Sequence, residues 1–392
     1  MRPRVLDLTD PSMLYATRLL ADLGADVIRV ESAGSVDLAV TVDPATAEDP
    51  QDVIHEYFNA GKRSVAVDLR RNEGREILAR LCAGVDLVID GVEPVIEGVE
   101  ATYARACDAN PRLTWVAVRG FEPDADGGFK STEIVRCALS GLMSITGDPG
   151  GPPMLIGGGL SNAVVATYAA LAGFLGLASA RKTGRGRLVR VSAHDALLSV
   201  MQQGLLEASV GGRVVKRAGS RHAHIAVAGA LPCRDGHVVV SASAQGIWGA
   251  LVDTVGDKRL RGEELASESA RMRRQDEIFR VLAEWAAPFS KVEISRVAQA
   301  RRVPVAPVHD MLDLLSDRHL RTRGFFRHLG GEGDMPHLRT PLGEGMGRAP
   351  RCGEHTGAVL SEIGLEPAEI AALEAQGVVT QARREATGAA RG

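Results

Sequence analysis

The chain has 392 residues, of which 45% are hydrophobic and 24% charged, and its formal net charge at pH 7 is −3. Such a length and composition are typical of a globular protein with two domains, or with one large and one smaller domain. The nearly balanced charge gives no global basis for binding nucleic acid or an anionic membrane. Five scattered cysteines without a Cys-x-x-Cys pair indicate a reducing compartment. With no signal-peptide pattern and no apolar span of membrane length, we expect a cytoplasmic protein.

The N-terminal half alternates strand and helix patterns. Its strand-like apolar runs lie at residues 4–8, 25–31, 64–69 and 85–90, with a further one inside 109–121. Helical patterns separate them, and each strand–helix–strand unit is about 30 residues long, the size of a parallel crossover. This alternation predicts an α/β fold with a parallel sheet covered on both faces.

From about residue 133 the pattern becomes helical. Helices are predicted over 133–147 and 162–184, both ending at glycine. A β-hairpin is predicted over 229–243, followed by helices near 244–256 and 274–300. These later elements predict a small α+β domain.

The order of these patterns divides the chain into four segments. We expect a large α/β domain over residues 1–208, a Gly-rich and basic linker over 209–228, and a small α+β domain over 229–325. Residues 326–392 are expected to return to the large domain and to end in a tail.

Few local motifs suggest chemistry. Gly157, Gly158 and Gly159 lead into a helix of small residues near Asn162, and such a helix N-terminus can hold an anion. These glycines lack the spacing of phosphate-binding loops. His222 and His224 have no evident third ligand, so no metal site is predicted. The basic cluster at 59–64 could meet a phosphate but is more typical of a solvated turn.

Several long blocks of the chain carry a more specific signal. They include "VLDLTDPSMLYATRLLADLGADVIRVE", "ALSGLMSITGDPGGPP" and "YAALAGFLGLASARKTGRGRLVRVSAHDALL". In this order they resemble the family III CoA-transferases of the CaiB/BaiF type, a group with formyl-CoA transferase, carnitine CoA-transferase and α-methylacyl-CoA racemase. The resemblance runs from residue 4 to about 378. It implies a Rossmann-like large domain, a smaller α+β domain, an interlocked dimer and coenzyme A as substrate.

The resemblance places a neutral amide where the transferases carry their nucleophile. Their catalytic aspartate lies six residues before the position of Tyr168, and that residue here is Asn162. An amide is a very poor nucleophile, so Asn162 can hydrogen-bond a thioester oxygen but cannot carry CoA by the family route. The racemase histidine corresponds to Thr132, which leaves Glu133 as the titratable group near the site. Glu133 is either a lone general base or a structural residue, as a cap or paired with Lys130.

The resemblance also assigns residues to CoA. Asp68, Leu69, Arg70 and Arg71 match the stretch that holds the nucleotide end, and Lys130 matches a lysine that contacts CoA. Cations at these positions suit phosphate groups.

Three other cations of the family pattern are replaced in this chain. Ser32, Glu93 and Val99 stand at those positions. Each lost charge-assisted phosphate contact costs about 1.5–3 kcal/mol, so the replacements predict weakened CoA binding.

Three functional hypotheses follow from these residues. The first is a CoA-transferase-like enzyme that acts on an acyl-CoA or carboxylic acid with an atypical site, and the fold favours an enzyme. The second is a non-catalytic subunit or repurposed binding protein, as a homodimer or as a heteromer with an Asp-bearing homologue. The third is racemase-, isomerase- or dehydratase-type chemistry on an α-proton with a single base.

Overall fold

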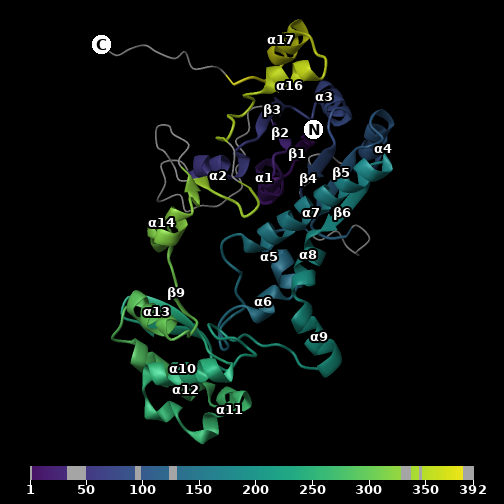
Figure 1. Ribbon diagram of the computed structural model, residues 1–392. Coiled ribbons are helices and arrows are strands. Elements are labelled where there is room, and N and C mark those ends of the chain that lie inside the picture. The colour runs from purple at the N-terminus through teal and green to yellow at the C-terminus, as the bar shows by residue number, and fades with distance from the viewer. Residues whose placement is uncertain are drawn as a thin grey trace, which may run out of the picture. The chain divides into compact units, whose positions relative to one another are not determined.

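The computed structural model describes residues 2–32, 50–92, 99–122, 130–327, 337–343 and 347–382 (Figure 1). The chain forms two compact units. The large unit comprises Met1–Ser140, Ile156–Met201 and Gly324–Gly392, and the small unit comprises Gly141–Leu155 and Gln202–Arg323.

A seven-stranded sheet forms the centre of the large unit (Figure 1). The strand order is β12-β3-β2-β1-β4-β5-β6, and every strand except β12 runs parallel to its neighbours. The strands are β1 (Arg4–Leu8), β2 (Asp26–Glu31), β3 (Arg63–Val67), β4 (Leu87–Asp90), β5 (Thr114–Arg119), β6 (Leu188–Ser192) and β12 (Val379–Thr380). The predicted α/β class with a parallel sheet is therefore confirmed. The strand order reverses direction between β1 and β4, where open parallel sheets form a ligand crevice.

Helices cover both faces of this sheet. The helical elements of the large unit are η1 (Pro11–Met13), α1 (Leu14–Asp22), α2 (Pro50–Asn59), α3 (Asn72–Ala83), α4 (Val99–Ala109), α5 (Glu133–Leu139), α7 (Leu160–Thr183), α8 (Ala193–Val200), α16 (Thr356–Glu362) and α17 (Pro367–Ala375). Side chains of α3, α4, α16 and α17 share one core with alternate strand residues such as Val88. Helix α7 packs on the opposite face, where Leu87 and Ile89 point. A short hairpin of β10 (Phe326–Arg327) and β11 (His337–Leu338) completes the unit.

Helix α7 is long and apolar enough to cross a membrane, judged by length and composition alone. In the structure it lies directly against β4, β5 and β6. A Cβ atom at Gly176 would lie 2.4 Å from Thr114 Cγ2, and one at Gly173 would lie 2.9 Å from Leu87 Cδ2. Glycine at these positions lets the helix approach the sheet, which explains the run of small residues in its sequence.

The small unit contains a three-stranded antiparallel sheet, β7 (Ala228–Cys233), β8 (Gly236–Ser241) and β9 (Val305–Pro307). Cys233 pairs with Gly236, so Arg234 and Asp235 form a two-residue turn and the predicted hairpin is confirmed. The helical elements are α6 (Leu142–Ile145), α9 (Gln202–Gly211), α10 (Gln245–Val255), η2 (Lys258–Leu260), η3 (Glu263–Leu265), α11 (Glu268–Arg273), α12 (Gln275–Ala286), α13 (Lys291–Ala300), α14 (Met311–Ser316) and α15 (Arg318–Thr322). Residues 212–227, within the predicted linker, form neither helix nor strand.

Two predicted helices are each broken into two. The helix expected over 133–147 ends as α5, and α6 starts after Gly141, whose φ of +80° interrupts the helical path. The segment 274–300 divides into α12 and α13 around Pro288, which cannot donate a backbone hydrogen bond. Ser290 then begins α13 with a capping box to Glu293.

The basic cluster at 59–64 is not a solvated turn, and this expectation was wrong. Lys62 is 4% exposed, and its ammonium group lies 2.9 Å from Asp7 Oδ2. Arg29 Nη1 contacts the other oxygen of Asp7 at 3.2 Å. Burial alone would raise the pKa of Asp7, but the charges of Lys62 and Arg29 and the hydroxyl of Thr17 hold it well below its usual range. The lysine is buried because the Asp7 carboxylate offsets its desolvation.

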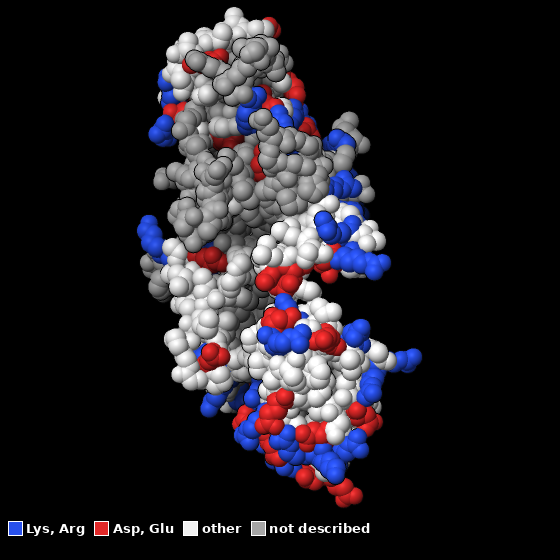
Figure 2. Space-filling view, turned by 90° about the vertical axis from the view of Figure 1, so that its left-hand side faces the viewer, with Lys and Arg blue, Asp and Glu red and all other residues white. Residues whose placement is uncertain are grey.

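The surface of the small unit mixes both signs of charge. On the face seen in Figure 2, Lys and Arg side chains lie beside Asp and Glu side chains over its lower part. Ion pairs such as Arg259 with Asp257 and Arg274 with Glu277 join opposite charges elsewhere in this unit. Such mixing creates no extended field of one sign on that face.

Candidate active site

Asn162 lies in the first turn of α7, at the end of the glycine run. Gly158 and Gly159 adopt left-handed backbone conformations, and Gly159 is the N-cap residue. The first bond within the helix runs from the Ala163 N–H to the Gly159 carbonyl, at 3.0 Å. The N–H groups of the preceding helical residues therefore have no acceptor within α7. Together with the positive end of the helix dipole, they favour a negatively charged or carbonyl oxygen at this position.

A buried arginine holds the Asn162 amide. Arg136 is 3% exposed, and its Nη2 donates to Asn162 Oδ1 at 2.8 Å. Its Nη1 donates to Ser131 Oγ, also at 2.8 Å. Because a guanidinium can only donate hydrogen bonds, the amide oxygen must face Arg136, and the Nδ2 group is left to act as a donor. The position of the family nucleophile thus carries an oriented hydrogen-bond donor.

Glu133 lies beside this amide. It is the first residue of α5, and its carboxylate accepts a hydrogen bond from the hydroxyl of Ser161, the residue before Asn162. The structure therefore brings the two predicted catalytic residues together, across the N-terminal turns of α5 and α7. Thr132 makes no side-chain cap bond to α5, and no ion pair joins Glu133 to Lys130 among the described contacts.

The four predicted CoA residues form the loop after β3. Arg70 Nε donates to Asp68 Oδ1 at 2.8 Å, and the Arg70 side chain is 87% exposed. Hydrogen bonding to Arg70 lowers the pKa of Asp68. Arg71 Nη1 donates to the Gln376 carbonyl at 2.6 Å, and Leu69 packs at the margin of the core. The loop thus presents one exposed guanidinium, already paired with a carboxylate.

Lys130 and the replaced family cations lie apart from that loop in the chain. Lys130 and Ser32 are exposed, Val99 is buried, and Glu93 lies outside the described residues. Within the part of the chain that the structure describes, no hydrogen bond or ion pair joins the 68–71 loop to Asn162, Glu133 or Lys130.

Sequence reasoning missed a second polar group, at the reversal point of the sheet. Asp90, at the end of β4, is fully buried, and Arg119 Nη2 donates to its Oδ2 at 2.6 Å. Burial raises the pKa of Asp90 to about 6, against the opposing effect of Arg119. A Cβ atom at the next residue, Gly91, would lie 2.3 Å from Asp10 Oδ2, so Asp10 at the end of β1 comes close. The signal for this group in the sequence is an aspartate, Asp90, that ends an otherwise apolar strand.

Arg136 was also missed, and its signal in the sequence is weak. It follows Glu133 by three residues on α5, so both side chains lie on one face of that helix. That spacing gives no indication that α7 supplies the partner of Arg136. Among the described residues, no group of three or more His, Cys, Asp or Glu side chains is arranged to hold a metal ion.

Comparison with known proteins agrees with this fold. Residues 3–356 match CoA-transferase family III. Succinyl-CoA:mesaconate CoA-transferase of Haloarcula marismortui is 30% identical over 382 residues, which cover 93% of this chain and 96% of that protein. A CaiB/BaiF family protein from Brucella suis has a similar crystal structure, with a TM-score of 0.80, 26% identity, and coverage of 92% of this chain and 98% of that one. The chain belongs to the family III CoA-transferases.

A further relative is a subunit of a transferase. Succinyl-CoA:(R)-benzylsuccinate CoA-transferase subunit BbsE of Thauera aromatica is 30% identical over 414 aligned positions, which cover 96% of this chain and 97% of that protein. The similarity to these proteins extends over nearly the whole chain and is not confined to one unit.

Proposed function

We propose that this chain binds an acyl-CoA and a carboxylic acid and transfers CoA between them without a covalent bond to residue 162. The observation that carries this proposal is the hydrogen bond from Arg136 to Asn162 Oδ1. It turns Nδ2 into a fixed donor for the thioester oxygen, beside the free N–H groups of α7. Donors fixed in this way stabilise the negative charge that develops on the oxygen when the thioester is attacked.

Direct transfer then needs both substrates bound together. A carboxylate oxygen of the acceptor acid attacks the thioester carbon, a C–O bond forms, and the C–S bond breaks to release CoA thiolate. The thiolate attacks the acceptor carbonyl of the resulting anhydride, which gives the new CoA thioester and frees the original acid. Protons and electrons balance without an enzyme-bound acyl group. In this scheme Glu133 positions Ser161 and the α7 turn through their hydrogen bond.

The proposed substrate class follows from the relatives. Several of them are named as transferases between succinyl-CoA and a dicarboxylic acid. We therefore assign a dicarboxylic acid and its CoA thioester to this chain, with the 68–71 loop and Lys130 near the phosphates of CoA. Exposed Arg70 and Lys130 are the cations available to the described part of this site.

A second chain is part of the proposal. Leu171, Phe174 and Leu175 of α7 are exposed, and β6 is an edge strand of the sheet within the described residues. Leu171 and Leu175 also line an apolar pocket with Val189 of β6. Apolar residues so grouped mark a protein interface, and the family resemblance assigns it to a dimer.

The second candidate function is a subunit that does not itself catalyse transfer. The name of the BbsE relative, a transferase subunit, favours it. The absence of a carboxylate at residue 162 has a simple reason in this case, because a homologous partner would supply the nucleophile. Here the chain would bind CoA or stabilise its partner through the α7 face.

The test is calorimetric and mass-spectrometric. Wild type is titrated with CoA and with succinyl-CoA, and steady-state rates are measured with succinyl-CoA and mesaconate as probes. We expect micromolar CoA binding, sequential kinetics, and no CoA or acyl adduct on the intact protein. The Asn162→Asp variant should form an adduct with succinyl-CoA, because a carboxylate can attack the thioester.

A matched control is Asn72→Asp. Asn72 also lies in the first turn of a helix and accepts a hydrogen bond from an arginine, Arg75, but it is outside the Asn162 site. This variant should form no adduct. CoA binding without turnover would favour the subunit, and an adduct on wild type or ping-pong kinetics would overturn direct transfer.

A further inference from the structure

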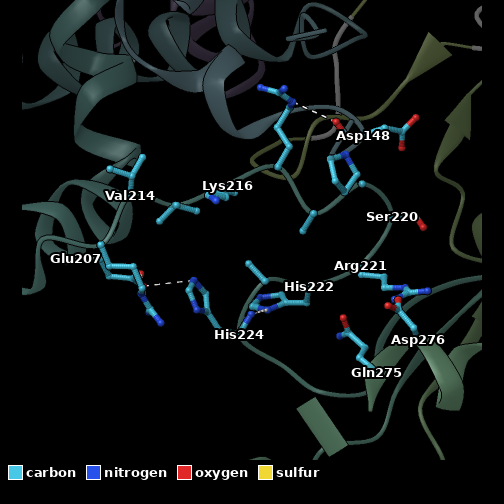
Figure 3. A pocket seen from close by; sticks show the side chains of 17 residues that line it. Asp148, Glu207, Val214, Lys216, Ser220, Arg221, His222, His224, Gln275 and Asp276 are labelled. Atoms are coloured by element: carbon cyan, nitrogen blue, oxygen red, sulfur yellow. Dashed lines mark hydrogen bonds and ion pairs between the residues drawn. The ribbon is translucent and has the colours of Figure 1, made fainter. Parts of the chain in front are cut away.

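The small unit contains an open pocket that the proposed function does not use. Its volume is about 620 Å³. It is lined by the loop 213–224, by Asp148 and Pro149, by Glu207 of α9, and by Gln275 and Asp276 of α12 (Figure 3). All of these residues belong to the small unit, so the pocket is complete within it.

Two of the three carboxylates that line the pocket are matched by guanidinium groups. Arg213 Nη2 lies 2.7 Å from Glu207 Oε2, and its Nε donates to the same oxygen at 3.1 Å. Arg221 pairs with Asp276 and lies over the ring of Phe279. These pairs leave little net charge at either side of the pocket.

Arg217 contributes a charge that the pocket does not neutralise. Its guanidinium donates to the backbone carbonyls of Gly151 at 2.8 Å, Asp148 at 3.1 Å and Ser144 at 3.4 Å. These acceptors are neutral, so the bonds position the arginine and hold the 144–151 segment without cancelling its charge.

Lys216 adds a second positive charge. It is exposed, and no hydrogen bond or ion pair of its ammonium group occurs among the described residues. The third lining carboxylate, Asp148, points away from the two histidines in Figure 3. Two unmatched cations against one outward carboxylate give the pocket a positive field.

The two histidines supply hydrogen-bond donors to the same pocket. His222 Nδ1 accepts from the backbone N–H of His224 at 3.1 Å, so the proton of the neutral His222 ring lies on Nε2. His224 Nε2 lies 3.3 Å from Glu207 Oε1, and the two rings meet edge to face with centroids 6.0 Å apart. In this arrangement His222 offers an N–H group and His224 is held by Glu207.

We propose that this pocket binds a small molecule through an oxyanion group, a carboxylate or a phosphate, with Lys216 and the His222 Nε2–H as direct donors. Arg217, held by three backbone carbonyls, raises the local potential without donating to the ligand. The pairs formed by Arg213 and Arg221 keep both guanidinium groups occupied, so the ligand meets an ammonium and an imidazole. The proposal rests on the pocket alone, and it stands or falls independently of direct CoA transfer at Asn162.

The experiment is calorimetric titration of the full chain with succinate and, separately, with inorganic phosphate. Both are run at constant ionic strength, and sodium chloride is the reference salt. We expect saturable binding of at least one anion and about tenfold weaker binding by Lys216→Gln, the loss expected for one charge-assisted hydrogen bond. His222→Gln should also weaken the binding of that anion. Succinate binding that Lys216→Gln weakens would identify a carboxylic acid ligand of this pocket, and phosphate binding that it weakens a phosphate ester. Binding that Lys216→Gln leaves unchanged belongs to another site and would overturn the proposal.

The matched control is Lys258→Gln. Lys258 is the first residue of η2 in the same unit and does not line the pocket. The Lys258→Gln variant should bind the anions as tightly as wild type does, and circular dichroism should show that all three variants are folded. Binding of neither anion, an equal heat with chloride, or an equal loss in the Lys258 variant would each overturn the proposal. CoA transfer is measured separately, as a steady-state rate with succinyl-CoA. The pocket is tested by anion titration, so each proposal is overturned by a different measurement.

Discussion

Lys62 and Arg136 are both buried cations of the large unit, and their partners differ. Lys62 lies against the carboxylate of Asp7, in a cluster that Arg29 completes. The contacts of Arg136 within the described residues include hydrogen bonds to the side-chain oxygens of Asn162 and Ser131. In the first region the pairing offsets the cost of burying charge. In the second, the cation orients an amide, so its main consequence is a fixed donor at the end of α7.

The two regions also differ in how far they are exposed. The Asp7 cluster is closed off from solvent on all sides. Asn162 is only half-buried, next to exposed glycines that leave the α7 N-terminus accessible. A carboxylate at residue 162 would place a negative charge at the oxygen that Arg136 contacts. The following substitutions test that contrast, from the largest expected effect to the smallest.

Asp7→Asn should have the largest effect on stability. It leaves the Lys62 ammonium group buried without the carboxylate that pairs with it, so we expect the free energy of unfolding to fall by about 3–5 kcal/mol. Urea unfolding followed by circular dichroism measures the change. Asp68→Asn, which breaks the exposed pair with Arg70, is the control and should leave the free energy of unfolding nearly unchanged. An equal loss of unfolding free energy in Asp7→Asn and Asp68→Asn would contradict the stabilising role of the buried pair.

Arg136→Met measures how strongly the amide is held. Losing a hydrogen bond from a buried charged donor should cost about 1.5–3 kcal/mol. A double-mutant cycle with Asn162→Ala isolates the coupling between the two side chains. A second cycle starts from the Asn162→Asp protein and measures the coupling between Arg136 and the new carboxylate. This coupling should be larger, because a carboxylate accepts the hydrogen bond more strongly than an amide oxygen does. A coupling near zero with asparagine would show that Arg136 does not position the amide.

Asp90→Asn should change the pH dependence of stability. The pKa of Asp90 is raised to about 6 in the folded chain, above its usual value of 3.8. The protonated form therefore stabilises the fold below about pH 4, and this contribution is lost as the pH rises through 6. Because asparagine cannot ionise, the variant should gain about 1–3 kcal/mol relative to wild type between pH 4 and pH 7. A difference between the two proteins that is constant with pH would contradict the shift.

Arg70→Ala should have the smallest effect on stability. The side chain is 87% exposed, so losing its pair with Asp68 should leave the free energy of unfolding nearly unchanged. CoA affinity, measured by calorimetry, should still fall about tenfold if Arg70 meets a phosphate. An unchanged CoA affinity would remove Arg70 from the proposed binding residues.

The sheet could be predicted from the sequence because its signal is local. Each parallel strand of the large unit is a short apolar run, and each crossover helix has its own stop. The antiparallel strand β12 was not predicted, because it has two residues and gains its partners only by returning to β3. Helix breaks at Gly141 and Pro288 were underweighted, although both residues were visible in the sequence.

The candidate site was predictable only in part. Family resemblance placed Asn162 and Glu133 in one site, and the structure brings them together through Ser161. The role of Arg136 was not predictable, because its partner lies 26 residues away and on another helix. Lys62 was misjudged for the same reason, since the carboxylate that permits its burial lies 55 residues earlier.

The sequence by itself determined the fold class, the family, and the replacement of a nucleophilic carboxylate by an amide at residue 162. These are properties of residue identity and local periodicity, which need no knowledge of distant contacts. Only the tertiary structure decided which cations are buried, which group of the Asn162 amide faces Arg136, and that the 213–224 loop lines an open pocket. Charge burial and hydrogen-bond orientation depend on partners that the fold brings from distant parts of the chain, and one-dimensional patterns do not record them.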